Sequence, residues 1–138
     1  MYWKLPHYRT QFPYVDTSLV GTGNIDKAAI FSAAGDSVWA ATPDFQIKPE
    51  EVKAILANLD KHGNDSPFFT SGIHIGSVKF LNVAHDEDHV YARQKKEGLV
   101  IIRTKQALII AHHPETVDRF KAVDTTKALT DYLKGVGY

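Results

Sequence analysis

The chain has 138 residues, which is enough for one domain and too few for two of ordinary size. It contains no cysteine, so disulfide scaffolds, thiolate zinc sites and cysteine nucleophiles are excluded. Sixteen basic and sixteen acidic residues leave no net charge, which argues against a partner recognised by bulk electrostatics alone. No run approaches the roughly 18 apolar residues of a membrane span, and the N-terminus lacks a signal-peptide layout, so we expect a soluble intracellular domain.

The beginning of the chain differs in character from the rest. Residues 1–13 are rich in aromatic residues and proline and show little periodicity. We interpret them as an atypical N-terminal arm and residues 14–138 as the single domain. Residues 14–20 can form a short helix, which Gly21 and Gly23 would close.

A hairpin and a helix are predicted next. Residues 28–33 and 37–42 are apolar stretches on either side of a glycine turn, a pattern typical of a β-hairpin. Pro49 suits the first position of a helix that would end near Gly63. Four apolar side chains follow Pro49 at the spacing of a half-buried helix: Val52, Ile55, Leu56 and Leu59.

The second half of the chain is rich in strand-like sequences. Five of them follow Pro67: residues 68–75, 77–84, 89–93, 98–104 and 107–112. Their short connections predict antiparallel neighbours. A last helix is expected at about residues 118–134. The predicted fold class is therefore α+β, with helices covering a central antiparallel sheet.

The zero net charge hides an uneven distribution. Residues 93–105 contain five basic side chains against a single acidic one, Glu97. Such a local field survives a neutral total, because screening at physiological salt acts over about 8 Å. An acidic partner is therefore not excluded.

Signals for catalysis are weak. Gly21-Thr22-Gly23 is a fragment of a phosphate loop without the later Lys-Ser/Thr, and a turn that closes a short helix is the favoured reading. The run from His85 through Asp86, Glu87 and Asp88 to His89 could bind a metal, but it falls where a solvated hairpin turn is expected. A metal-dependent enzyme built on this run remains a less favoured alternative.

Two further observations argue against an enzyme. His112 and His113 are neighbours on one strand, so their rings should point to opposite faces and not ligate one ion. No nucleophile elbow and no paired carboxylates occur at catalytic spacing. We expect a protein that is not an enzyme and that needs no cofactor or metal.

Residues 14–23 closely resemble the start of fungal profilins, and similar motifs continue to the C-terminus. The motifs that carry the resemblance are Gly35-Asp36-Ser37-Val38-Trp39-Ala40, Gly76-x-x-Lys79, Glu97-Gly98, Arg103-Thr104-Lys105-Gln106, Ile109-Ile110-Ala111-His112, Pro114-Glu115-Thr116 and Asp131-Tyr132-Leu133-x-Gly135-Val136-Gly137-Tyr138. The resemblance covers residues 14–138 nearly without gaps.

This resemblance implies a profilin-like fold, with a central antiparallel sheet between paired terminal helices and smaller helices. It also implies a monomeric, cytoplasmic protein of the actin cytoskeleton and cell cortex that regulates actin polymerisation. The implied partners are monomeric actin, proline-rich proteins such as formin-type assembly factors, and phosphoinositide head groups; nucleic acid is not among them.

The resemblance also assigns site residues. The poly-proline groove would contain four aromatic residues: Tyr14, Trp39, Tyr132 and Tyr138. Exposed aromatic faces suit a preformed polyproline II helix. The family's usual tryptophan three residues before Tyr14 is replaced by Gln11, so we expect weaker binding of proline peptides than for a member with the usual start.

For actin, the resemblance implies contacts from Lys79, Arg93, Lys95 and Val117, with His112 and His113 nearby. Ala84 and Phe120 depart from the family pattern in this region. They motivate the alternative of an altered profilin-fold module that binds proline-rich peptides or lipids without strong actin binding.

The phosphoinositide site would be the basic cluster of Arg93, Lys95, Lys96, Arg103 and Lys105. Such clusters gain about 1 kcal/mol per basic residue near an anionic surface.

Overall fold

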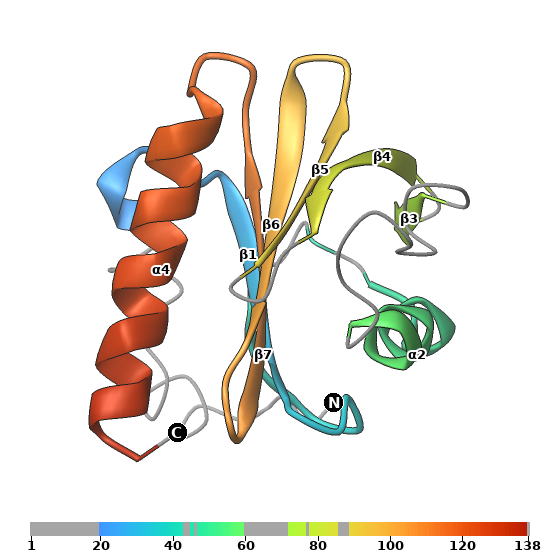
Figure 1. Ribbon diagram of the computed structural model, residues 1–138, viewed down its shortest axis with the longest axis vertical. Helices are drawn as coiled ribbons and strands as arrows, with labels where there is room; N and C mark the ends of the chain where they lie inside the picture. Colours follow the sequence, from blue (N-terminus) through green and yellow to red (C-terminus); the bar gives the residue numbers. More distant parts are fainter. Residues whose placement is uncertain are drawn as a thin grey trace.

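The computed structural model describes residues 20–42, 45, 47–59, 72–76, 78–85 and 89–137. Within these residues, seven strands form one antiparallel sheet in the order β2-β1-β7-β6-β5-β4-β3 (Figure 1). The strands are β1 (Lys27–Ser32), β2 (Val38–Ala41), β3 (Ile73–Ile75), β4 (Val78–His85), β5 (Val90–Gln94), β6 (Glu97–Arg103) and β7 (Ala107–His113). The helical elements are the 3-10 turn η3 (Val20–Thr22), α2 (Pro49–Asn58) and α4 (Arg119–Gly135).

The two α-helices lie on opposite faces of the sheet, with α4 along one face and α2 beside β3 and β4 on the other (Figure 1). Helix α2 begins at Pro49. Proline has no backbone N–H, and at the first position of a helix that group would have no hydrogen-bond partner within the helix. Helix α4 begins after Asp118, whose side chain accepts hydrogen bonds from the backbone N–H groups of Phe120 and Lys121. No helix among the described residues is long and apolar enough to span a membrane.

The sheet separates two hydrophobic layers because successive side chains of a strand point to opposite faces. On the α4 side, Tyr91 and Val100 pack with Leu129 and Leu133 of the helix. On the α2 side lies a second set of apolar side chains that includes Phe80, Leu99, Ile110, Val52 and Ile55. Strand β7 is buried along its whole length because it is covered on both faces.

The structure confirms the predicted α+β class and most predicted elements. The first hairpin and the last helix occur within one residue of the expected positions. The helix at Pro49 begins as predicted, but it ends at Asn58, before the expected end near Gly63. Of the expected strand at 68–75, the described part is β3. Residues 1–19 lie outside the described residues, so the N-terminal helix and the boundary between the arm and the domain stay predictions.

Candidate functional site

Three of the predicted actin-contact cations meet at one end of the sheet. In the β4–β5 pairing Leu81 lies opposite Arg93, and the antiparallel register brings Lys79 beside the turn that contains Lys95. The side chains of Lys79, Arg93 and Lys95 are all exposed. Lys96, the other residue of the β5–β6 turn, is exposed as well. We call these four cations the basic end.

The backbone of the β5–β6 turn is unusual. Gln94 and Glu97 are paired, so Lys95 and Lys96 form a two-residue hairpin turn. Lys95 has φ of +57° and is the only described residue other than glycine with a positive φ. Glycine is the ordinary residue in such a position, since a side chain there raises the conformational energy. The chain therefore has a lysine at a position where the backbone geometry favours glycine.

The start of α4 lies at the same end of the sheet as the β5–β6 turn (Figure 1). Val117 is half-buried just before the helix, and its N–H donates to the carbonyl oxygen of Pro114. Arg119, the first residue of α4, places its guanidinium 4.9 Å from the centre of the Tyr91 ring. This cation–π contact fixes the helix start against β5. The basic end and Val117 thus border one surface.

His112 and His113 do not lie on that surface. Their exposed fractions are 4% and 2%, because β7 is an interior strand covered on both faces. Both rings are therefore buried beside the surface, and their role in actin binding stays a prediction. The prediction that they point to opposite faces is confirmed: His113 stacks on Tyr91, whereas His112 contacts the ring of Phe80.

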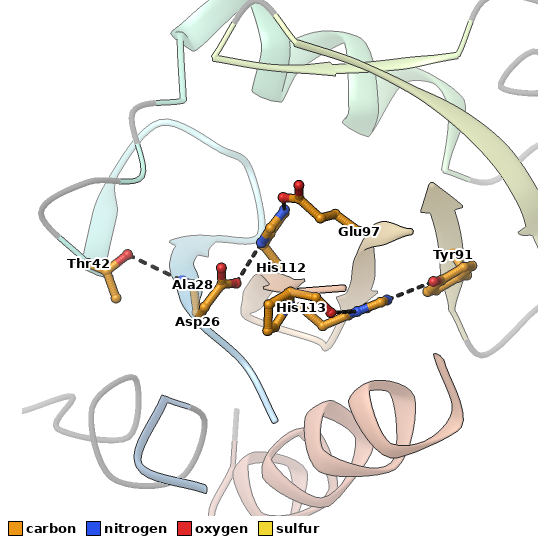
Figure 2. A network of polar contacts seen from close by, with 8 residues as sticks. Asp26, Ala28, Thr42, Tyr91, Glu97, His112 and His113 are labelled. Carbon is orange, nitrogen blue, oxygen red and sulfur yellow. Dashed lines mark hydrogen bonds and ion pairs between the residues drawn. The ribbon is translucent and has the colours of Figure 1, made fainter. Parts of the chain in front are cut away.

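The polar partners of His113 determine its tautomer (Figure 2). Its Nδ1 lies 2.8 Å from the carbonyl oxygen of Pro114, which can only accept, so Nδ1 carries the hydrogen. In the neutral ring, Nε2 then accepts from the hydroxyl of Tyr91 at 2.7 Å. Gly98 closes this site: a Cβ there would lie 2.6 Å from Nε2 of His113 and closer still to the Tyr91 hydroxyl oxygen. Glycine is thus required beside the pair.

His112 lies between two carboxylates (Figure 2). Its Nδ1 is 2.5 Å from Oδ1 of Asp26, and its Nε2 is 3.1 Å from Oε1 of Glu97. Asp26 precedes β1 and Glu97 begins β6, so the ring joins the two strands that flank β7. His112 thus links β1, β7 and β6 through its two ring nitrogens.

The five cations assigned to phosphoinositides do not form one cluster. Arg93 pairs with Gly98, and Arg103 lies five residues further along β6, a separation of about 17 Å at roughly 3.4 Å per residue. Lys105 follows in the β6–β7 turn, at the opposite end of the sheet from the β5–β6 turn (Figure 1). The expectation of a single site is corrected: Arg93, Lys95 and Lys96 share one end, and Arg103 and Lys105 the other.

Two of the four aromatic residues expected in the proline groove are described. Trp39 on β2 is partly buried against the apolar layer under α4, and Tyr132 near the end of that helix is 51% exposed. Both side chains therefore belong to the α4 side of the sheet. Tyr14 and Tyr138 lie outside the described residues.

The C-terminal end of α4 lies at the β6–β7 turn. The side-chain amide of Gln106 in this turn donates to the carbonyl oxygen of Gly137 at 2.9 Å. Val38, next to Trp39, pairs with Phe31, which pairs in turn with Leu108 just after the turn. Trp39 and the end of α4 are therefore at the same end of the molecule, opposite the basic end.

The structure describes part of the two segments that carried weak enzymatic signals. Val20–Thr22 forms a 3-10 turn, and Gly23 follows with φ of +81°. This geometry is consistent with the interpretation of Gly21-Thr22-Gly23 as a turn. Nε2 of His85 lies 2.9 Å from the carbonyl oxygen of Leu59. Among the described residues, no three metal-ligating side chains converge, and residues 86–88 of the acidic run fall outside them.

Sequence reasoning missed two residues of the surface beside the basic end, Leu81 and Arg119. Leu81 is 59% exposed and lies directly opposite Arg93 on β5. The sequence did contain a signal for Leu81: it is two positions from Lys79 on one strand, so the two side chains share a face. The role of Arg119 depends on contact with Tyr91, 28 positions away, and had no local signal.

Comparison with known proteins finds similar sequences and a similar fold. The family model described as Profilin matches residues 12–138. A profilin of Schizosaccharomyces pombe is 43% identical over 126 residues, which cover 91% of this chain and 96% of that protein. A profilin of Saccharomyces cerevisiae is 42% identical over 125 residues, with the same coverage. A crystal structure of the S. pombe profilin superposes with a TM-score of 0.84 and covers 91% of this chain and 97% of that one.

Proposed function

The chain belongs to the profilin family of actin-binding proteins that regulate polymerisation, and we propose that it works by holding actin and a proline-rich segment at opposite ends. The observation that carries the proposal is the register that brings Lys79 beside Arg93 and Lys95, next to Val117 at the start of α4. Clustered cations steer an acidic partner and raise its association rate. His112 and His113 support this surface from within.

The proline-rich partner would bind at the other end. Trp39 and Tyr132 on the α4 side, with Tyr14 and Tyr138, are the aromatic residues proposed to receive a polyproline II helix. Formin-type assembly factors are the kind of partner that carries such segments. Holding actin and the proline-rich protein together raises the effective concentration of actin where filaments are built.

For phosphoinositides we propose a smaller site than the sequence suggested. Arg93, Lys95 and Lys96 lie within one turn and could face one head group, whereas Arg103 and Lys105 lie too far away. Because this site overlaps the proposed actin surface, the two ligands would compete. The protein would act as a non-enzymatic, monomeric binding protein in the cytoplasm and at the cell cortex.

Charge reversal at Lys79 tests the actin surface. Lys79→Glu should weaken binding to monomeric actin at least about tenfold, because a like charge would then face the acidic partner. Lys105→Glu is the matched control: it makes the same charge change on an exposed side chain in the β6–β7 turn. The measurement is sequestration of pyrene-labelled actin monomers. Equal loss in both variants would contradict the proposed surface.

A further inference from the structure

The surface next to the basic end carries two large apolar side chains. Phe120 on the first turn of α4 is 71% exposed, and Leu81 on β4 is 59% exposed, the two highest values among the large apolar residues described. Leu81 pairs with Arg93, which lies on the same face of the sheet as Tyr91 two positions away. The Arg119 side chain, which lies over Tyr91, joins this part of the sheet to Phe120.

Phe120 belongs to a stack that begins in the core. The His113 ring lies parallel to Tyr91, with an interplanar angle of 13° and 5.8 Å between ring centres, and accepts its hydroxyl hydrogen. The guanidinium of Arg119 is 4.9 Å from the Tyr91 ring centre and 5.5 Å from that of Phe120. Each group therefore contacts the next, from a buried histidine to an exposed aromatic ring.

Phe120 departs from the family pattern, and we propose that it does not weaken actin binding but is the aromatic anchor of the actin-binding surface, in contact with Arg119. This inference rests on the proposed function and adds which residue of this chain lies at the centre of the actin-binding surface. Aromatic side chains have few rotatable bonds and large contact areas, and such residues often dominate interface energetics. The surrounding cations are complementary to an acidic partner, which favours an actin monomer as the occupant over a second, equally basic copy of this surface.

Arg119 acts as a positioning residue in this proposal. Its guanidinium contacts two rings, so in this proposal its main role is to orient Phe120 and not to pair with a carboxylate of the partner. Lysine would retain part of the cation–π contact, whereas alanine would remove it. If Arg119 works through Phe120, its removal should matter only while Phe120 is present.

The decisive experiment measures the dissociation constant for monomeric actin together with the thermal unfolding midpoint. Phe120→Ala should weaken binding about tenfold and leave the midpoint unchanged, because the ring is largely exposed. Val136→Ala is the matched control, since Val136 is 52% exposed at the other end of α4. Arg119→Ala should weaken binding about threefold and Arg119→Lys less, with under a twofold further loss when Arg119→Ala is added to Phe120→Ala.

The outcomes separate this inference from the proposed function. Wild-type protein that binds actin while Phe120→Ala binds equally well overturns the anchor but leaves the function standing. Wild-type protein that binds a proline decamer but not actin overturns both. A concentration-dependent dimer in sedimentation that Phe120→Ala abolishes would show that a second copy, and not actin, occupies the surface.

Discussion

At the scale of single residues, Lys95 is expected to lower the stability of the fold while it contributes to actin binding. It occupies the first position of a two-residue turn with φ of +57°, where a side chain costs on the order of 1 kcal/mol. Lys95→Gly should therefore raise the free energy of unfolding by up to about 1 kcal/mol, partly offset by the greater freedom of glycine in the unfolded chain. The same change should weaken actin binding by removing a cation of the basic end. Urea denaturation and actin titration measure the two effects.

Lys96→Gly is the appropriate comparison for Lys95. Lys96 sits in the same turn and carries the same charge, but its φ is not positive. Glycine at Lys96 should lower stability slightly, since it relieves no strain and adds flexibility to the unfolded chain. If Lys95→Gly also lowers stability, the positive φ is not a significant source of strain.

At the scale of elements, one buried carboxylate joins α2 to the β3–β4 turn. Oε1 of Glu51 accepts hydrogen bonds from the backbone N–H groups of Lys48 at 2.9 Å and Gly76 at 2.8 Å. Gly76 precedes β4, so this hydrogen bond connects α2 to the turn that leads into the strand that carries Lys79. The helix on the face opposite α4 thereby contributes to the proposed actin surface.

Removal of this carboxylate tests that connection. Glu51→Ala should reduce the free energy of unfolding by about 2 kcal/mol, because two charge-assisted hydrogen bonds are lost. Glu51→Gln should cost less, since its amide oxygen can still accept from both N–H groups. Glu50→Ala, one residue earlier on the exposed side of α2, is the control. Equal losses in chemical denaturation for Glu51→Ala and Glu50→Ala would contradict the role of the buried carboxylate.

At the scale of the whole molecule, the two proposed binding regions lie at opposite ends of α4. Arg119 and Tyr132 are thirteen residues apart on one helix, a distance of about 20 Å at 1.5 Å per residue. Ligands at the two ends should therefore not touch the same side chains. The actin dissociation constant should change less than twofold when a proline decamer saturates the protein.

Vesicles that contain phosphoinositide provide the contrasting measurement. They should displace actin, because Arg93, Lys95 and Lys96 belong to both proposed sites, and the displacement should weaken as salt is raised. Displacement of actin by the decamer, or actin binding that saturating vesicles leave unchanged, would contradict this division of the molecule into two ends.

The sequence alone determined the elements and the family. Helix α2 was predictable from Pro49 and the spacing of its apolar residues, and the last helix from its periodicity and Gly135, because these signals are local. The opposite orientations of His112 and His113 were also predictable, since alternation along a strand requires no knowledge of its neighbours.

The tertiary structure alone decided which of these residues share a surface. Arg93 and Arg103 are ten positions apart in one basic run, yet the length of β6 holds them at opposite ends of the sheet. Lys79 is distant in sequence but joins Arg93 through strand pairing. The burial of His113 and the stack that leads from it to Phe120 depend on where α4 packs. Strand pairing and helix packing bring together residues that are far apart in the chain, and these long-range contacts leave no local pattern in the sequence.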